Sequence, residues 1–414
     1  MKILYLNFDR GIPVLGDKGA SVHVREFVQT AADLGHEVVL ACATLGGGNA
    51  APAAKIFEFP VVSPRPTEAH GGVLAPEGAG EHVAELTREL ARLEHNRSVG
   101  ERVLAMLARH DFQPDFVYER HALFSTAGIG IAARLGCRRI LEVNAPLVEE
   151  QKRFRTLRLE GLARQMEADS FAAAHAVIAV SERVRTYVEA RAPRAVAVHV
   201  MPNGVDLRRF AAGGACRERL RRTIGVDPDT CVIGFVGSFK PWHGTDFLLD
   251  VYRELAVKRP VHLLGVGDGP QLSGLRDRAA SFGNGTVTLV GRVPHVQIPE
   301  WTAAIDIVVA PYRAASDFYF SPLKVVEALA CGRPVVAPRI GQLPELIKDG
   351  GTGLLYEPDD PQDCRRALTR LIEDRDLRTA LGRNARASVA GRGWDGIVSR
   401  VVELAGVTAI ARAS

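Results

Sequence analysis

The sequence predicts an α/β protein built from two doubly wound domains. Apolar strand-like runs alternate with amphipathic helical segments, which is typical of parallel sheets covered on both faces. The alternation stops at residues 202–206, PNGVD, and then restarts with a series of similar length. At 414 residues the chain is also too long for one hydrophobic core. We therefore expect Rossmann-like domains at 1–204 and 205–391, and a C-terminal helix within 392–414 that packs back on the first domain.

Short apolar runs bounded by turn residues mark the strands. They are expected at 2–8, 37–43, 56–60, 116–119, 139–143, 176–180 and 195–201, and then at 231–237, 261–266, 286–290, 305–310, 334–337 and 353–356. A helix is expected from Ser21 to Leu34, a long helical region over 80–110, and a final helix near 394–410. Because such sheets bind ligands at the carboxyl ends of their strands, both domains would present a site to one cleft.

The composition restricts the partners. A net charge of +4 is compatible with phosphorylated ligands or an anionic membrane surface, and is far from the charge of nucleic-acid-binding proteins. No stretch approaches ~20 apolar residues, and the N-terminal apolar run is too short for a signal peptide. We expect a cytoplasmic protein, with a peripheral contact to the inner membrane face left open. No histidine and cysteine spacing resembles a zinc site, so no metal or other cofactor is expected. The oligomeric state is not predicted.

The helix that follows Ser321 is the most informative segment. Ser321 is a good N-cap, and Pro322 fits the first helical position. The amides of Leu323 and Lys324 would then be unpaired at the positive end of the helix, where anions bind. Lys324 adds a charge, and Glu327 lies on the same helix face. Phosphates and hydroxyls together suit this site, and a nucleotide-sugar carries both.

Two other loops of the second half carry candidate donor-binding residues. Lys240 and His243, in the loop 237–244, would reach a diphosphate. Val293 closely follows a strand, where backbone groups would meet a nucleobase edge. For each residue alone, a surface or structural role is the alternative.

The loop 11–19, between the first strand and the first helix, is rich in glycine. Gly16 would let backbone amides approach an anion, with Ser21 opening the helix behind it. A crossover turn without a ligand is equally compatible with the pattern. The loop lacks G-x-G-x-x-G, which disfavours a dinucleotide.

The remaining candidates of the first half are polar residues at or near strand ends. His121 ends a strand and would hydrogen-bond a sugar hydroxyl. Arg120, His23 and Asn144 are the candidates for the acceptor side. A structural role is the alternative for each.

A run of basic residues follows Asn144. A solvated helix face is the default interpretation, and contact with an anionic acceptor or a membrane is the alternative. The run comprises Lys152, Arg153, Arg155, Arg158 and Arg164.

Taken together, four motifs resemble the family-4 glycosyltransferases of GT-B fold. They are PNGVDLRRF at 202–210, GSFKPWHG at 237–244, LVGRVPH at 289–295 and SPLKVVEALACGRPVVAP at 321–338. The resemblance implies two Rossmann-like domains facing a central cleft. It also implies a retaining, metal-independent enzyme that uses a nucleotide-diphosphate sugar, with uridine the favoured base and glucose or N-acetylglucosamine the favoured sugar. The acceptor would be a hydroxyl of a small molecule or a cell-envelope intermediate.

The resemblance also implies roles for single residues. Glu327 looks like the second glutamate of the family's E-x7-E element, which holds the ribose. The backbone of Leu323 and Lys324 would meet the distal phosphate, Gly16 the diphosphate, His121 the transferred sugar and Val293 the base.

This chain departs from the family pattern at two places. The first glutamate of E-x7-E is replaced by Tyr319, and Asp317 is the candidate to hold the sugar instead. The usual Arg and Lys after the first strand of the second domain appear as Ser238 and His243. Lys240, together with Lys324, would then steady the leaving diphosphate. A branch of the family with an S-P-x-K sequence looks similar here.

Other functions remain as alternatives. A GT-B nucleotide-sugar epimerase, or another enzyme that does not transfer the sugar, is the main one. A nicotinamide-dependent oxidoreductase would need a G-x-G-x-x-G that the first strand–helix junction lacks. A non-catalytic sugar-binding protein would have little use for a leaving-group site.

Overall fold

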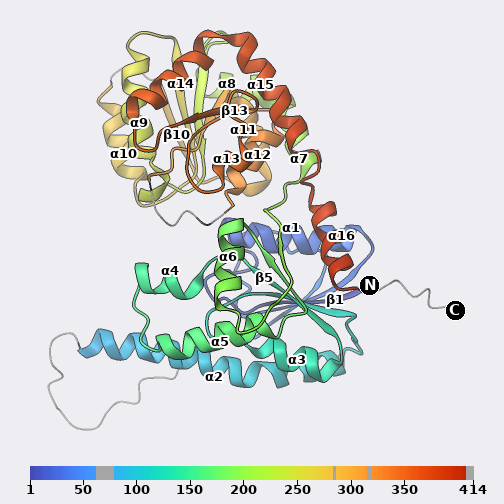
Figure 1. The fold of residues 1–414 in the computed structure, drawn as a ribbon. Coiled ribbons are helices and arrows are strands. Elements are labelled where there is room, and N and C mark those ends of the chain that lie inside the picture. Colours follow the sequence, from blue (N-terminus) through green and yellow to red (C-terminus); the bar gives the residue numbers. More distant parts are fainter. Residues whose placement is uncertain (62–78, 283–285, 315–318, 320, 407–414) are drawn as a thin grey trace. The chain divides into compact units, whose positions relative to one another are not determined.

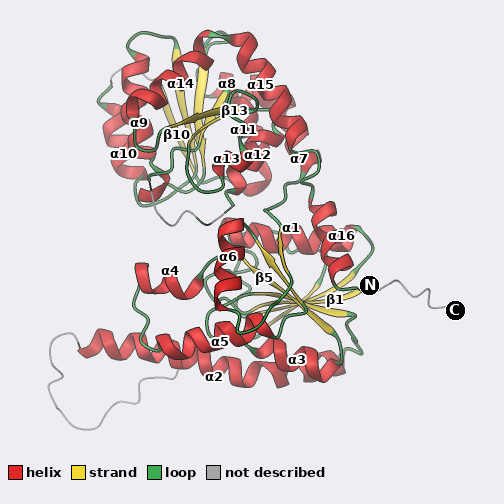
Figure 2. Ribbon diagram, viewed as in Figure 1, coloured by secondary structure: helices red, strands yellow, loops and turns green. Residues whose placement is uncertain are grey.

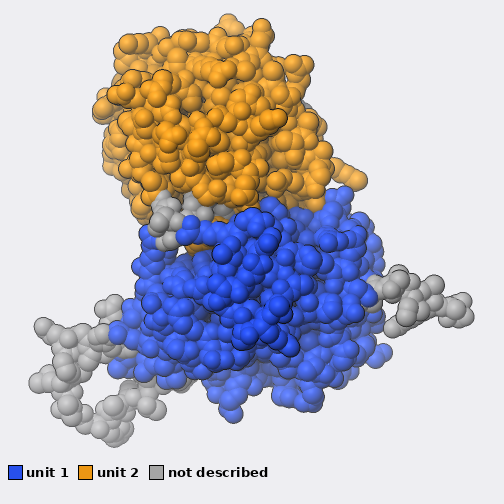
Figure 3. Space-filling view, viewed as in Figure 1, with its two compact units in different colours: residues 1–202, 395–414 blue, residues 203–394 orange. Residues whose placement is uncertain are grey.

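The structure is a computed structural model, and it describes residues 1–61, 79–282, 286–314, 319 and 321–406. Its helices and strands are shown in Figures 1 and 2. The chain divides into two compact units: unit 1 is Met1–Pro202 with the C-terminal segment from Asp395, and unit 2 is Asn203–Trp394 (Figure 3). Each unit contains a parallel sheet with helices on both faces. The predicted class, two Rossmann-like α/β domains, is confirmed.

Unit 1 contains a seven-stranded parallel sheet in the order β3-β2-β1-β4-β5-β6-β7. The strands are β1 (Lys2–Asn7), β2 (Glu37–Cys42), β3 (Lys55–Glu58), β4 (Phe116–Arg120), β5 (Arg138–Val143), β6 (Ala176–Ala179) and β7 (Val198–Val200). The order reverses between β1 and β4. In doubly wound sheets this is the point at which ligands bind, outside the carboxyl ends of the strands.

Helices cover both faces of this sheet. They are α1 (Gly19–Asp33), α2 (Ala79–Arg109), α3 (Ala127–Leu135), α4 (Leu147–Phe154), α5 (Glu160–Ala172), α6 (Glu182–Arg191) and α16 (Trp394–Leu404). On one face Phe27 of α1 stacks on Tyr118, with 4.4 Å between the ring centroids. On the other face Val99 and Val103 of α2 lie in a core with Ile131 of α3.

Two helix boundaries of unit 1 differ from the prediction. Helix α1 begins at Gly19 after Lys18, so Ser21 lies inside its first turn and is not its N-cap. Burial decides this: Ser21 is fully buried, so its hydroxyl is not at the exposed start of the helix. Helix α16 ends at Leu404, and the predicted residues 407–410 lie outside the described residues. Arg138 Nη1 donates to the carbonyl of Ala405 at 3.0 Å, which holds the end of this helix in unit 1.

Unit 2 contains a six-stranded parallel sheet in the order β10-β9-β8-β11-β12-β13. The strands are β8 (Cys231–Val236), β9 (Val261–Val266), β10 (Val287–Gly291), β11 (Ile307–Val309), β12 (Val335–Pro338) and β13 (Gly353–Tyr356). The helices are α7 (Leu207–Ala212), α8 (Arg217–Thr223), α9 (Thr245–Ala256), α10 (Leu272–Ala280), α11 (Ile298–Ala304), α12 (Leu323–Ala330), α13 (Leu343–Leu346), α14 (Pro361–Glu373) and α15 (Arg375–Ser388), with 3-10 turns η1 (Gly213–Cys216), η2 (Pro241–His243) and η3 (His295–Gln297). Here the order reverses between β8 and β11.

Alternate residues of the central strands enter two cores, one on each face of this sheet. Val232 of β8 packs with Val325 and Leu329 of α12, whereas Ile233 packs with Leu248 of α9 and Leu368 of α14. Gly237, directly after β8, lies against Lys324, so the amino end of α12 lies at the carboxyl end of β8. Among the described residues, no helix is long and apolar enough to cross a membrane.

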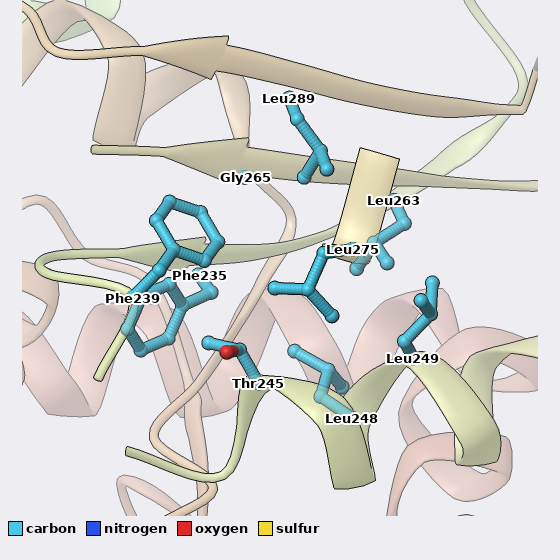
Figure 4. A pocket seen from close by; sticks show the side chains of 9 residues that line it. All are labelled: Phe235, Phe239, Thr245, Leu248, Leu249, Leu263, Gly265, Leu275 and Leu289. Atoms are coloured by element: carbon cyan, nitrogen blue, oxygen red, sulfur yellow. The ribbon is translucent and has the colours of Figure 1, made fainter. Parts of the chain in front are cut away.

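A small cavity of about 20 Å³ lies in the second of these cores (Figure 4). Phe235, Phe239 and five leucines of the sheet and of α9 and α10 line it, with Thr245 at one side. The hydroxyl of Thr245 already donates to Gln271 Oε1 at 3.2 Å. An apolar cavity of this size, without convergent polar groups, is a packing space and not a ligand site.

Candidate functional site

The start of α12 differs from the prediction. The helix begins at Leu323, its N-cap residue is Pro322, and no side chain caps it. Ser321 is therefore not the N-cap. Its hydroxyl accepts from the amide of Asn203 at 3.4 Å, and its carbonyl accepts from Asn203 Nδ2 at 2.7 Å. Local preferences would use the hydroxyl of Ser321 to cap the helix. Here Asn203, which is distant in the sequence, binds it instead.

Without a cap, the first amides of α12 are left unpaired. The amide of Val325 donates to the carbonyl of Pro322 at 3.0 Å. Neither Leu323 nor Lys324 finds an acceptor for its amide within the described part of the chain. Both amides lie at the positive end of the helix, which favours an anion.

Lys324, in the first turn of this helix, carries an ammonium group that is buried. Among the described residues it has no hydrogen-bond partner. Its Nζ lies 4.3 Å from the ring centroid of Phe235 and 5.2 Å from that of Tyr312, so two aromatic faces hold the cation. Burial lowers the pKa of Lys324 to about 7, against the opposing effect of Glu327. A buried, unpaired cation of this kind is typical of a functional site.

Two glycines give this lysine its position. A Cβ atom on Gly237 would lie 2.7 Å from Lys324 Nζ, so the absence of a side chain makes room for the ammonium group. A Cβ atom on Gly267 would lie 1.9 Å from the carbonyl oxygen of Gly237. Both glycines have positive φ, at +142° and +135°. The turn 265–269, GVGDG, thus has a structural role here: it packs against the loop that holds Lys324.

His243 lies in the same loop and is neutral. Its Nδ1–H donates to the carbonyl of Ser238, which leaves Nε2 as an acceptor. Burial lowers the pKa of His243 to about 3, and the charge of Lys324 contributes. Lys240 Nζ lies 4.7 Å from the ring centroid of Trp242, which is 49% exposed. The ring of Trp242 therefore lies at the surface.

Glu327 is buried one turn after the start of α12. Its Oε1 lies 3.2 Å from Nε2 of His295 in η3. Val293 is half-buried and packs on the core that contains α12. Tyr319 is half-buried, whereas Asp317 lies outside the described residues. The structure therefore brings together Leu323, Lys324, Glu327 and His243 within unit 2.

In unit 1, a network of buried charges joins three of the predicted acceptor-side residues. Glu142 of β5 lies 2.5 Å from Nε2 of His23 and accepts from Arg120 Nη1 at 3.2 Å. Burial alone would raise the pKa of Glu142, but His23 and Arg120 hold it at about 2, with a contribution from Asn144. The network joins α1 to the carboxyl ends of β4 and β5.

His121 belongs to a second buried group. Its Nε2 lies 3.3 Å from Oε1 of Glu167, and the hydroxyl of Tyr187 donates to the other oxygen of Glu167 at 2.5 Å. The Nδ1 atom of His121 has no partner among the described residues. If Nε2 carries the proton, Nδ1 is free to accept one from a hydroxyl.

Gly16 lies in the loop before α1, and its amide is already used. It donates to the carbonyl of Pro13 at 3.0 Å, while the carbonyl of Gly16 accepts from Arg25 at 2.6 Å. A Cβ atom here would lie 2.7 Å from Pro13 Cγ, so the loop requires glycine for its own packing.

The sequence prediction did not identify several partners. Glu142 and Glu167 carry the networks of unit 1, and His295 holds Glu327. A charged residue inside a buried strand, such as Glu142, is a usable signal because it needs a counter-charge. His295 was part of a quoted motif but was given no role. Asn203 offered no local signal.

Comparisons with known proteins add the following. Residues 18–204 match the glycosyl transferase 4-like domain, and residues 230–374 match the glycosyl transferases group 1. D-inositol 3-phosphate glycosyltransferase 1 of Catenulispora acidiphila is 30% identical over 339 residues, which are 76% of this chain and 77% of that protein. The D-inositol 3-phosphate glycosyltransferase of Corynebacterium jeikeium is 33% identical over 229 residues, 53% of this chain and 54% of that one.

This chain spans about half the length of the Corynebacterium protein and of several similar relatives. The structure of Anabaena Alr3699/HepE in complex with UDP superimposes with a TM-score of 0.70 at 20% identity, covering 98% of this chain and 100% of that one. At this identity the likeness concerns the fold.

Proposed function

Because the chain belongs to the group 1 glycosyl transferases, we propose that it moves a hexosyl unit from a nucleotide-diphosphate sugar to a hydroxyl acceptor. The donor is UDP-linked glucose or N-acetylglucosamine, and the acceptor is a small molecule or a cell-envelope intermediate. One observation carries the proposal: the first turn of α12 holds both a buried ammonium group without a partner among the described residues, that of Lys324, and two unpaired amides. Together they suit the diphosphate of such a donor.

The leaving diphosphate is the centre of the mechanism. Negative charge builds on its distal phosphate as the bond to the sugar breaks. Lys324 and the amides of Leu323 and Lys324 are fixed in advance and meet that charge without reorganisation, and this kind of electrostatic stabilisation usually contributes most to catalysis. Lys240 supplies a second cation. With lysines and amides in this role, the reaction needs no metal ion.

Other residues orient the two substrates. Glu327, held by His295, accepts from the ribose hydroxyls, and the backbone near Val293 meets the base. His243 offers its neutral Nε2 as an acceptor. The Anabaena complex with UDP supports uridine as that base.

In unit 1, His121 accepts from a hydroxyl of the transferred sugar. Transfer proceeds with retention on one face of the sugar, and the departing phosphate takes the proton of the acceptor hydroxyl. No protein nucleophile is required. Asp317 is proposed to hold the sugar in place of the family glutamate.

The test measures nucleotide release. The protein is incubated with UDP-glucose or UDP-N-acetylglucosamine, with and without a panel of alcohols and phosphorylated polyols, in the presence of EDTA. We expect UDP to appear only with both a donor and an acceptor, and NMR of the product to show the anomeric configuration of the donor. A new sugar epimer without UDP release would instead identify an enzyme that does not transfer. Loss of turnover in EDTA would refute metal independence.

A further inference from the structure

Three polar side chains of unit 1 form a chain of hydrogen bonds that begins at His121. His121 directly follows β4, and its amide donates to the carbonyl of Glu142 at 2.8 Å, so it stands at the carboxyl edge of the sheet. Its Nε2 lies 3.3 Å from Oε1 of Glu167 on α5. The hydroxyl of Tyr187, on α6, donates to the other oxygen of this carboxylate at 2.5 Å. Residues from three separate elements thus meet in one network.

Packing holds the members of this network in place. The side chains of His121 and Glu167 are only 3% and 2% exposed. The ring of Phe171, one turn after Glu167 on α5, lies 5.3 Å from the ring of His121 and 6.3 Å from that of Tyr187, centroid to centroid. On Tyr187, the guanidinium carbon of Arg191 lies 3.8 Å from the ring centroid. The imidazole and the phenol therefore cannot turn without disturbing these contacts.

The hydrogen bonds determine where the protons lie. Burial and the neighbouring charge of Glu167 raise the pKa of the Tyr187 phenol, so the phenol keeps its proton and donates it to Oε2. A carboxylate only accepts, so the proton between Glu167 and His121 belongs to Nε2 of the imidazole. In the neutral ring, Nδ1 is then an acceptor. This Nδ1 atom is buried and has no partner among the described residues.

We propose that Glu167 and Tyr187 are positioning residues that fix His121 in its Nε2–H tautomer, so that Nδ1 selects a donor sugar with a hydroxyl at the position it meets. A buried acceptor without a partner costs free energy. A sugar hydroxyl donates to Nδ1 and removes this cost, whereas a group that only accepts, such as fluorine, does not. The inference rests on the proposed function for the sugar; the tautomer of His121 does not depend on it.

The first test observes the tautomer by long-range ¹H–¹⁵N NMR of the full chain labelled with ¹⁵N-histidine. A spectrum of His121→Asn identifies the signals of His121 among the 12 histidines. In the wild type we expect the proton on Nε2. In Glu167→Gln the amide oxygen keeps the hydrogen bond from Tyr187, so the amide NH₂ group faces Nε2 of the imidazole. The proton of His121 should then move to Nδ1.

Two further variants separate this effect from a general loss of structure. Glu89→Gln is the matched control, because Glu89 is a buried glutamate of unit 1 that accepts two backbone amides, at 2.9 and 2.8 Å, and it should leave the tautomer of His121 unchanged. Adding Tyr187→Phe to Glu167→Gln frees the amide to turn its oxygen toward His121, and the Nε2–H tautomer should return.

A wild-type His121 with its proton on Nδ1 would overturn the proposal, whether or not the variants fold. An unchanged tautomer in Glu167→Gln would overturn it as well.

The second test measures the selection of the sugar. With the acceptor that supports UDP release, kcat/KM is compared for UDP-glucose and for a series of UDP-deoxyfluoroglucoses in which fluorine replaces one hydroxyl at a time. We expect the preference for hydroxyl over fluorine at one position to be about 10- to 100-fold larger in the wild type than in Glu167→Gln, the usual effect of leaving a buried acceptor unpaired. The intrinsic effect of fluorine cancels, because the same substrates are used with each protein.

A double-mutant cycle shows whether Glu167 acts through His121. In the His121→Asn background, Glu167→Gln should not change the preference further, and Glu89→Gln alone should keep the preference of the wild type. An equal preference in the wild type and in Glu167→Gln would overturn the proposed selection.

The two proposals fail separately. If UDP is never released but the tautomer of His121 shifts in Glu167→Gln and returns in the double variant, the transferase is refuted and the positioning of His121 stands. If UDP is released with an acceptor but wild-type His121 carries its proton on Nδ1, the positioning is refuted and the transferase stands.

Discussion

Two regions of the molecule bury charge in opposite ways. At the carboxyl ends of β4 and β5 in unit 1, the carboxylate of Glu142 is closed by His23 and Arg120. At the start of α12 in unit 2, the ammonium group of Lys324 is buried near the rings of Phe235 and Tyr312 and has no hydrogen-bond partner among the described residues. A paired buried charge can support the fold, whereas an unpaired one lowers the stability of the protein until a ligand of opposite charge binds it. The comparison therefore favours a structural role for Glu142 and supports the donor role that we propose for Lys324.

Removing the charge of Lys324 should give the largest effect. We expect Lys324→Met to lower kcat by a factor on the order of 100 to 1,000, the usual loss when one group that stabilises the developing charge is removed. The same change should raise the free energy of unfolding at pH 7 by about 0.5–2 kcal/mol, because the variant buries no cation. Turnover with UDP-glucose and thermal unfolding check the two parts. Lys258→Met, at an exposed lysine of the same unit, should change neither; a variant Lys324→Met with normal kcat would remove the basis of the donor site.

Breaking the network of unit 1 should act on stability. Glu142→Gln leaves His23 and Arg120 buried without their carboxylate, and we expect the free energy of unfolding to fall by about 3–5 kcal/mol. Urea unfolding measures this. Glu101→Gln is the control, since Glu101 pairs with Arg134 at the surface and should contribute less than about 1 kcal/mol. Unchanged stability in Glu142→Gln would make this network a ligand site like that of unit 2.

Glu327→Gln should weaken donor binding and leave stability nearly unchanged. The amide keeps a hydrogen bond to His295 but loses the charge-assisted bonds to the ribose, so we expect the Kd for UDP to rise about 10- to 100-fold. Isothermal titration calorimetry measures it. Glu300→Gln, at a surface ion pair with Arg219, is the control. An equal Kd in the two variants would place the ribose elsewhere.

The smallest effect expected is a pH dependence of UDP binding. The pKa of Lys324 in the free protein is about 7, and a bound diphosphate must raise it. Binding above pH 7 therefore takes up a proton, so the affinity for UDP should fall as the pH rises from about 7 to about 9, by at most about tenfold per pH unit. Lys324→Met should show a flat profile over this range. A fall of the same size in the variant would assign the proton to another group.

The sequence predicted the elements well because their signals are local. Short apolar runs marked the strands, and β9 and β13 have the predicted bounds at 261–266 and 353–356. Caps were predicted less well. Ser21 and Ser321 both have the residue type of an N-cap, yet one is buried inside α1 and the other is bonded to Asn203. Cap preferences describe which groups could bond, and distant partners decide which ones do.

In the candidate site, too, some features follow from local sequence signals and others depend on partners distant in the sequence. Lys324 and Glu327 could be proposed from the sequence because a helix start and a one-turn spacing are local properties. By itself, the sequence determined the two series of strands and helices and the residue types present at the start of α12. Only the tertiary structure decided that Gly237 and Phe235 lie against Lys324, and that Glu142 is paired with His23 and Arg120. The reason is physical: residue type and periodicity fix what a segment can form, but the burial and the partner of each charge depend on which distant segments pack against it.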